Sequence, residues 1–286
     1  MRALVLSGGG SKASYQCGAL QYLLRDLKIE YDIFCGVSAG AINCAFLSQF
    51  KTGQEVESVN QLTDLWLEIN TSKIYQRWKP FGRLHALWQK SFYDSSPLHK
   101  LIKTHMSIEK IRESGKQISI GAISLSSGKY TIFDQNHDFF IDSVIASASF
   151  PGMMGPVKIA GHWWADGGVK EITPLKTAID LGATHIDVIM TSPEKRVKFF
   201  MEEPSTGDII QRVIDLSSDK IMSNDIEKAE MYNRLASRGD PDRREIKFHI
   251  IRPQHNLIED LLDFDPVKIK EMMQKGYQDA VINYKI

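Results

Sequence analysis

The first 49 residues of this 286-residue chain contain the same unit twice: a short apolar run, a turn with glycine and a helical segment. Residues 2–6 form the first apolar run, and residues 31–35 form the second. Residues 12–27 place apolar side chains on one helical face, and a second helix is expected from about 41 to 49. Strands that alternate with helices form parallel sheets. The chain is therefore expected to adopt an α/β fold.

The remaining sequence continues this mixed pattern. The stretch from about 54 to 106 is rich in aromatic residues and is expected to be a mainly helical insertion or covering layer. Two hairpins are expected, one from 117–124 and 129–133 and one from 157–160 and 163–165. Helices are predicted at 138–147, 174–181, 207–238 and 266–283, and strands at 186–190 and 246–252. The absence of an internal repeat or low-complexity tract favours a single domain over residues 1–286.

Charge and cysteine content limit the possible partners and the compartment. Basic and acidic residues both number 35, so no net field favours nucleic acid or another polyanion. The three cysteines lie in apolar sequence and lack metal-ligand spacing, which is typical of reduced core residues. The first apolar run is too short for a signal peptide, and no stretch approaches the ~18 residues of a membrane span. A cytoplasmic protein without a cleaved signal peptide or a transmembrane span is expected, and its oligomeric state stays open.

The second glycine turn, Gly36-Val37-Ser38-Ala39-Gly40, has the pattern G-x-S-x-G. It falls between a predicted strand and a predicted helix, where this pattern forms a nucleophile elbow. Gly36 and Gly40 let the chain turn sharply and leave the Ser38 hydroxyl at the tip of the turn. The alternative is an ordinary turn of glycine and serine, but the strand and helix on either side favour Ser38 as a nucleophile.

The first glycine turn, Ser7-Gly8-Gly9-Gly10-Ser11-Lys12, exposes successive backbone N–H groups at the start of a helix. Such a nest binds anions and suits an oxyanion hole. A competing interpretation is a dinucleotide-binding fingerprint, because Gly8, Gly10 and Ala13 fit G-x-G-x-x-A and the acidic Glu30 and Asp32 follow about 20 residues later. That interpretation leaves the adjacent G-x-S-x-G turn without a role, so the oxyanion loop is favoured.

A third motif, Asp166-Gly167-Gly168, follows the second predicted hairpin. Asp-Gly pairs are common in simple turns. In a chain with the other two motifs, Asp166 can supply the base that a serine nucleophile requires.

These motifs, in this order and together with the run Ala146-Ser147-Ala148-Ser149-Phe150-Pro151, resemble the patatin-like phospholipase family over at least residues 2–175. The resemblance implies a three-layer α/β/α fold with a mainly parallel central sheet and a nucleophile elbow early in the chain. It also implies a Ser38–Asp166 dyad without histidine, with oxyanion donors from Gly8, Gly9 and Gly10 and Lys12 as a member of the loop. Ala13 departs from the glycine more frequent in the family, but alanine suits a first helical turn.

The expected reaction is acyl transfer through Ser38 to water, which implies no metal or organic cofactor. The resemblance implies a lipid ester substrate, such as a phospholipid, a lysophospholipid or an acylglycerol. One alternative is an α/β-hydrolase triad of Ser38, Asp166 and His255, although that fold places several strands before the nucleophile. Another alternative is a lipid-binding or scaffolding module without catalysis, but the serine, the acid and the glycines are all present.

The aromatic residues between 66 and 93 have two interpretations. Interleaved with Lys73, Arg77, Lys79, Arg83 and Lys90, they suit a lid or a peripheral membrane contact. Equally, they suit the buried side of covering helices.

Overall fold

The computed structural model describes residues 1–79, 88–194, 203, 206–258 and 260–284. Its central sheet has eight strands: β1 (Arg2–Leu6), β2 (Ile33–Val37), β3 (Gln117–Ser124), β4 (Tyr130–Asp134), β5 (Val157–Ile159), β6 (His162–Asp166), β7 (His185–Ile189) and β8 (Lys247–Ile251). Strands β3, β2, β1, β7 and β8 run parallel in that order. The two predicted hairpins form the antiparallel pairs β3–β4 and β5–β6. The expected mainly parallel sheet is therefore confirmed.

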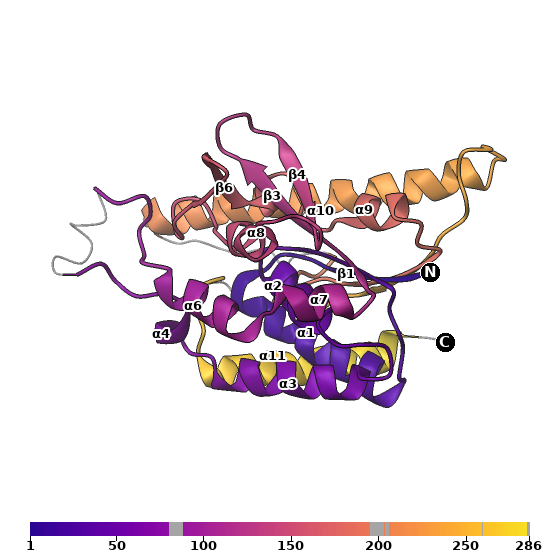
Figure 1. Ribbon diagram of the computed structural model, residues 1–286, viewed down its shortest axis with the longest axis horizontal. Helices are drawn as coiled ribbons and strands as arrows, with labels where there is room; N and C mark the ends of the chain where they lie inside the picture. Colours follow the sequence, from indigo (N-terminus) through magenta and orange to yellow (C-terminus); the bar gives the residue numbers. More distant parts are fainter. Residues whose placement is uncertain (80–87, 195–202, 204–205, 259, 285–286) are drawn as a thin grey trace.

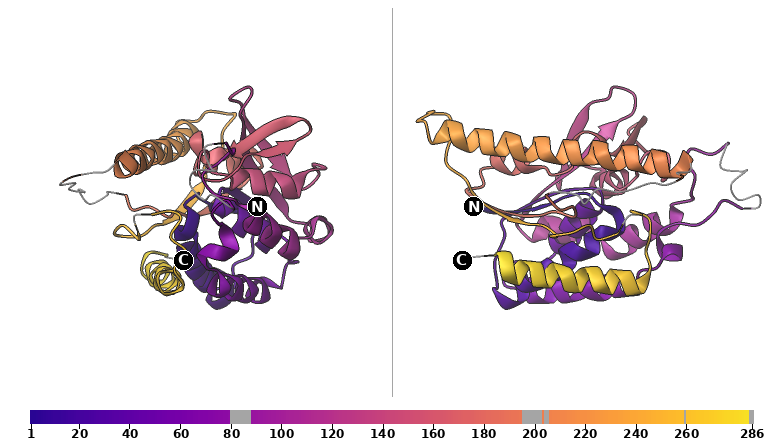
Figure 2. Two further views of the ribbon diagram at one scale, coloured as in Figure 1. Left: turned by 90° about the vertical axis from the view of Figure 1, so that its left-hand side faces the viewer. Right: turned by 180° about the vertical axis from the view of Figure 1, so that it is seen from behind.

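Helices cover both faces of this sheet (Figures 1 and 2). One layer contains α1 (Ala13–Leu20), α2 (Ala39–Leu47), α3 (Glu55–Glu68), α6 (Ser96–His105), α7 (Ile108–Glu113) and α11 (Pro266–Asn283). The opposite layer contains α9 (Leu175–Asp180) and the long α10 (Thr206–Ala236). Alternate residues of β1 explain the sandwich, because Leu4 and Leu6 join the core under the first layer and Ala3 and Val5 join the core under the second. Among the described residues, no helix is both long and apolar enough to cross a bilayer.

The helix predicted at 12–27 is composite. A 3₁₀ turn at Gly10–Lys12 leads into α1, and the last turns, Gln21–Asp26, are π-helical. Helices make up more than half of the described residues of the covering segment at 54–106. It contains α3, the short α4 (Thr71–Ile74) and α6, whereas the described residues from Tyr75 to Ser95 form no helix.

Strand β3 is longer than its neighbour β2, and this difference in length builds the site. Strand β2 pairs with β3 up to Val37, which lies opposite Gly121. The next residue of β3, Ala122, pairs with Asp166 at the end of β6. Strand β4 occupies one edge of β3. Strands β2 and β6 therefore share the opposite edge of β3, where they meet end to end. Ser38, directly after Val37, is thereby brought beside Asp166.

A buried carboxylate in β7 connects strands β1, β7 and β8 to Tyr284, which follows α11. Asp187 in β7 is fully buried and accepts hydrogen bonds from Arg2 Nε (2.9 Å), Tyr31 (2.7 Å) and Tyr284 (3.1 Å). His249 Nδ1 lies 3.0 Å from the same carboxylate. The last described residue thus joins β1, β7 and β8.

Candidate active site

Ser38 occupies a strained turn between β2 and α2. Its φ and ψ are 57° and −132°, a conformation that costs an L residue on the order of 1–3 kcal/mol. The flanking glycines allow close backbone contact, since a Cβ at Gly36 would lie 2.6 Å from the Gly40 carbonyl oxygen and one at Gly40 would lie 2.4 Å from that of Leu6. The G-x-S-x-G segment therefore has the geometry of a nucleophile elbow.

Ser147, in α8 (Phe140–Ser147), holds this elbow in place. The Ser38 backbone N–H donates to the Ser147 hydroxyl at 2.9 Å, and that hydroxyl donates to the Gly121 carbonyl at 2.7 Å. The run from Ala146 to Pro151 supported the family resemblance, but sequence reasoning gave Ser147 no role. A small hydroxyl residue beside the other motifs was the only available signal.

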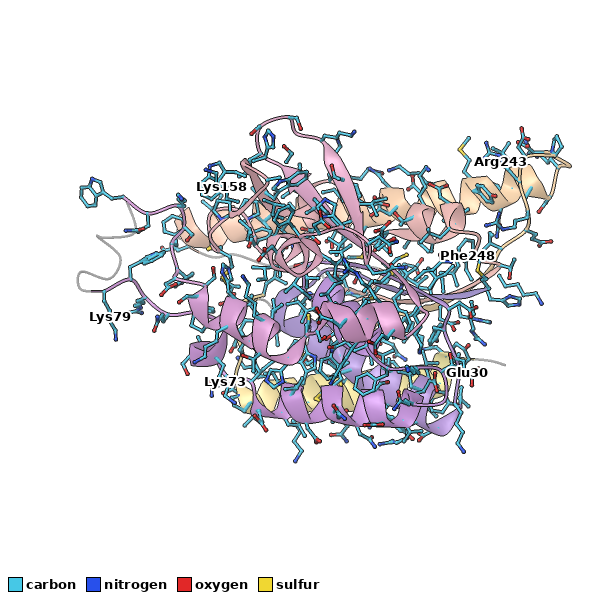
Figure 3. The ribbon with its side chains drawn as sticks, in the orientation of Figure 1. Glu30, Lys73, Lys79, Lys158, Arg243 and Phe248 are labelled. Carbon is cyan, nitrogen blue, oxygen red and sulfur yellow. The ribbon has the colours of Figure 1, made fainter. Side chains whose placement is uncertain are left out.

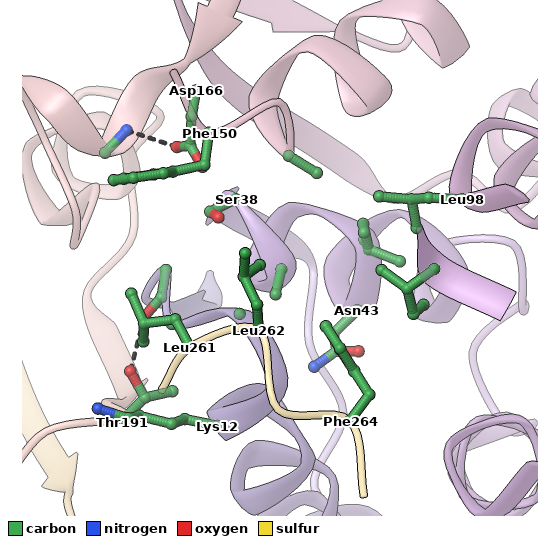
Figure 4. Close-up of a pocket in the computed structure, with 18 of the residues that line it drawn as sticks. Lys12, Ser38, Asn43, Leu98, Phe150, Asp166, Thr191, Leu261, Leu262 and Phe264 are labelled. Atoms are coloured by element: carbon green, nitrogen blue, oxygen red, sulfur yellow. Dashed lines mark hydrogen bonds between the residues drawn. The ribbon is translucent and has the colours of Figure 1, made fainter. Parts of the chain in front are cut away.

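Asp166 ends β6 with its carboxylate directed toward Ser38 (Figure 4). Its backbone N–H donates to the Ser149 carbonyl at 3.0 Å, and its side chain accepts from the Gly168 N–H at 2.7 Å. The residue is 1% exposed. Burial raises the pKa of the Asp166 carboxyl to about 7, while hydrogen bonding from the Ser38 hydroxyl and the Gly168 amide oppose the rise. The carboxylate is thus a base suited to neutral pH.

The glycine loop lies against the nucleophile. A Cβ at Gly8 would lie 3.1 Å from Ser38 Cβ, and Gly10 has a φ of +57°, which favours glycine. The Gly8 N–H, expected to be an oxyanion donor, instead donates to the Ile172 carbonyl at 3.2 Å. Within the described part of the chain, no protein group accepts from the N–H of Gly9 or Gly10. The free donors of the loop are therefore Gly9 and Gly10.

A cavity of about 480 Å³ opens over Ser38, Asp166 and the glycine loop. Lys12, which is buried, lines it too. Much of the wall is apolar and comes from α2, α3, α6 and the segments around 150–154 and 258–264, including Ile42, Phe46, Leu62, Trp66, Leu98, Ile102, Phe150, Met154, Leu262 and Phe264. Where α10 contributes, the wall includes Arg212, Asp215 and Ser218. The cavity is thus apolar over most of its wall and polar toward α10.

The dinucleotide interpretation does not fit the sheet. Glu30 and Asp32 precede β2, at the opposite end of the parallel strands from the glycine loop, which follows β1. Figure 3 shows Glu30 at the edge of the molecule, and the Asp32 carboxylate accepts from the Arg2 backbone N–H at 2.8 Å. A fingerprint acid must follow its strand to reach a ribose at the glycine turn. The two carboxylates therefore cannot serve a nucleotide bound there.

The histidine of the alternative triad lies elsewhere. Burial raises the pKa of the Asp279 carboxyl in α11, and the charge of the nearby His255 opposes this rise. His255 is not among the described residues that line the cavity, and His249 contacts Asp187 instead. The one histidine of the described lining is His105, at the end of α6.

An elbow serine, a buried aspartate and a glycine loop thus lie together beneath an apolar cavity on an α/β fold. The chain matches the patatin-like phospholipase family over residues 4–179, more than half of its length, and it belongs to this family. This membership supports a lipid-hydrolysing function.

Two curated relatives are informative. The chain is 30% identical over 192 residues to the probable lipid hydrolase 463L of Invertebrate iridescent virus 6, covering 62% of this chain and 63% of that protein. It is 28% identical over 199 residues to the cGAMP-activated phospholipase of Escherichia coli (strain TW11681), covering 61% and 53%. The chain therefore spans less than two thirds of the length of these relatives.

Solved structures also align with nearly the whole chain. VipD from Legionella pneumophila aligns with a TM-score of 0.48 and 15% identity, covering 98% of this chain and 66% of that one. The type III effector ExoU aligns with a TM-score of 0.44 and 14% identity, covering 99% and 52%.

Proposed function

We propose that this protein is a lipid acyl hydrolase of the phospholipase A or lysophospholipase type that works through a Ser38–Asp166 dyad. The observation that carries the proposal is the end-to-end meeting of β2 and β6 on one edge of β3. It sets a strained serine beside a buried carboxylate whose pKa is raised to about 7.

In the first step, Asp166 accepts the Ser38 proton while the serine oxygen attacks the ester carbonyl carbon. The resulting oxyanion accepts hydrogen bonds from the N–H groups of Gly9 and Gly10, and the N-terminus of α2 adds a favourable dipole. Asp166 then returns the proton to the leaving alcohol, and an acyl-enzyme remains. In the second step, Asp166 takes a proton from water as the hydroxide attacks the acyl carbon. The bond from that carbon to the serine oxygen then breaks, Asp166 gives the proton to Ser38, and the fatty acid is released.

The cavity supports a lipid ester as substrate. An acyl chain can lie against the apolar wall from α2, α3 and α6, and the polar part of the ester can face Arg212 and Ser218 on α10. Burial of the acyl chain of the substrate removes apolar surface from water and provides most of the binding free energy.

We further propose that the protein contacts a lipid surface at the end of the molecule that carries residues 88–92. Trp66 is buried, whereas Trp88 is 79% exposed and Phe92 is 58% exposed. Phe81 and Arg83 lie outside the described residues. Lys90 and Lys158 lie over the Trp163 ring, and Lys79 and Lys158 lie at this same end in Figure 3. Exposed aromatics with lysines nearby suit the interface of an anionic membrane.

The decisive experiment combines labelling with turnover. A fluorophosphonate probe should label the purified protein, and Ser38→Ala should lose both labelling and hydrolysis of p-nitrophenyl esters. Asp166→Asn should also lose turnover, because an amide cannot accept the proton. His255→Ala and His105→Ala are the matched controls and should retain most activity. A folded His255→Ala protein without activity would instead support the triad, and liposome binding by a wild-type protein without turnover would support a non-catalytic module.

Membrane contact has its own test. Replacement of Trp88 and Phe92 by alanine should weaken binding to anionic vesicles while leaving the hydrolysis of soluble esters unchanged. Trp66→Ala is the contrasting variant and should instead destabilise the fold, because this side chain is buried and donates to Asn43 at 2.9 Å. Unchanged vesicle binding in the Trp88 and Phe92 double variant would refute the proposed contact.

A further inference from the structure

Both backbone groups of Gly8 are held by the protein. Its carbonyl accepts a hydrogen bond from Thr191 Oγ1 at 2.7 Å, drawn in Figure 4, and its N–H donates to the Ile172 carbonyl at 3.2 Å. Thr191 follows β7 and is almost fully buried. In a trans peptide, the carbonyl oxygen and the next N–H point in opposite directions. The bond from Thr191 to the Gly8 carbonyl therefore sets the direction of the Gly9 N–H.

Thr191 also packs directly against the loop. A Cβ at Gly9 would lie 2.3 Å from Thr191 Oγ1. The Gly8–Gly9 peptide thus has little room to rotate without loss of the Thr191 bond. Ser7 Oγ provides a second and longer bond, 3.1 Å, to the same carbonyl.

The segment that holds the Gly8 N–H is in turn fixed by α10. Asp225 of α10 is 4% exposed, and its Oδ2 accepts from the N–H groups of Ile172 (2.9 Å) and Thr173 (3.0 Å). Hydrogen bonds to an ionised acceptor are about twice as strong as neutral ones. The ammonium group of Lys228 lies 3.8 Å from this carboxylate and is largely exposed. The backbone of residues 172–173 is therefore the main partner of Asp225.

We propose that Thr191 and Asp225 are positioning residues that clamp the Gly8–Gly9 peptide from two sides and thereby aim the Gly9 N–H at the oxyanion. Neither residue takes part in proton transfer. This inference rests on the proposed acyl hydrolase function and extends it to the side chains that hold the oxyanion loop.

Steady-state kinetics with a p-nitrophenyl ester tests the clamp. Thr191→Val keeps the shape of the side chain but removes the donor, and it should lower kcat by about tenfold or more with little change in KM, since one oxyanion donor is worth about 10²–10³ in rate. Thr191→Ser keeps the donor and should restore kcat. The double variant Ser7→Ala/Thr191→Val should lose more than either single variant. Asp225→Ala should lower kcat, and Asp225→Asn, which keeps an acceptor oxygen, should recover part of it.

Amide hydrogen exchange provides a readout that does not require turnover. Asp225→Ala should accelerate exchange at Gly8, Ile172 and Thr173 while leaving exchange in β1 unchanged. If the wild-type protein is folded but inactive, the proposed function fails and exchange alone decides the clamp. Unchanged exchange at Gly8 in Asp225→Ala, or wild-type kcat in a Ser7→Ala/Thr191→Val protein of unchanged melting temperature, would overturn the inference.

Discussion

The backbone N–H of Ser38 donates to the Ser147 hydroxyl at 2.9 Å, and through that hydroxyl the nucleophile turn is bonded to the Gly121 carbonyl. The strained turn is thus held by a side chain from a helix more than 100 residues away in sequence. Two backbone polar groups depend on this one hydroxyl.

Replacement of Ser147 by alanine should therefore loosen the elbow. Loss of the hydroxyl leaves two buried groups without their partner, at about 1–3 kcal/mol of stability, and kcat should fall by about tenfold or more. Ser143→Ala is the matched control, because Ser143 is equally buried in α8 but its hydroxyl donates to the Phe140 carbonyl within the same helix. Equal kcat in the two variants would show that Ser147 does not position the nucleophile.

The pH dependence of turnover should follow Asp166. Its pKa is raised to about 7, so kcat/KM should rise through a midpoint near pH 7 and level off at higher pH, because only the ionised carboxylate can accept the Ser38 proton. A histidine would give a similar midpoint. The temperature dependence separates the two, since a carboxyl group has a much smaller ionisation enthalpy than an imidazole. A midpoint that shifts strongly with temperature would contradict the dyad.

The same shift predicts a stability effect of opposite sign to the activity effect. The pKa of Asp166 is raised from 3.8 to about 7 in the folded state, so ionisation of the buried group destabilises the fold above about pH 4, fully so above pH 7. Asp166→Asn removes this penalty. Its melting temperature should exceed that of the wild type at pH 8, and the difference should shrink toward pH 4. A difference that is constant with pH would argue against the raised pKa.

The glycine loop should not tolerate side chains. Gly9→Ala places a Cβ 2.3 Å from Thr191 Oγ1, and Gly10→Ala places one 2.3 Å from the Leu261 carbonyl oxygen at a φ of +57°. Both variants should misdirect the donors and lower kcat by about 10²-fold or more. Gly128→Ala is a control with a positive φ of 65° and open space around it, so it should keep kcat despite some loss of stability. Near-normal kcat in folded Gly9→Ala would reduce the loop to a structural turn.

The buried Asp187 cluster should contribute to stability and not to catalysis. Asp187→Ala removes the common acceptor of Arg2, Tyr31 and Tyr284, and loss of one partner of a buried charged network costs about 3–5 kcal/mol. Chemical denaturation should show this loss. The kcat of the protein that remains folded should match the wild type.

Periodicity and motif order predicted most of the sheet and its order of helices and strands. The helix predicted at 266–283 has the same bounds as α11, because Asp265 caps it and Pro266 opens it. The covering segment was harder to predict. Among its aromatic residues, Trp66 is buried in the core and Trp88 is exposed on the surface. Local sequence does not distinguish these two environments.

For the candidate site, sequence could locate the residues of contiguous motifs and could not locate their supports. The elbow, the glycine loop and the Asp-Gly-Gly turn each occupy one short stretch. Thr191 bonds to the Gly8 carbonyl, and Asp225 bonds to the N–H groups of Ile172 and Thr173. These segments are far away in the chain, and no local pattern marks either residue. Likewise, the Gly8 N–H is not a free donor because it bonds to the carbonyl of Ile172, a residue far away in the chain.

The register of β3 has a consequence for partial unfolding. Val37 and Asp166 are paired with consecutive residues of one buried strand, whereas the glycine loop depends on a side chain of the covering helix α10. Peripheral helices open at lower free energy than central strands. A sub-global opening that releases α10 would therefore leave Ser38 and Asp166 together while the glycine loop is misaligned. Heat would then stop turnover reversibly at temperatures below the melting temperature of the sheet.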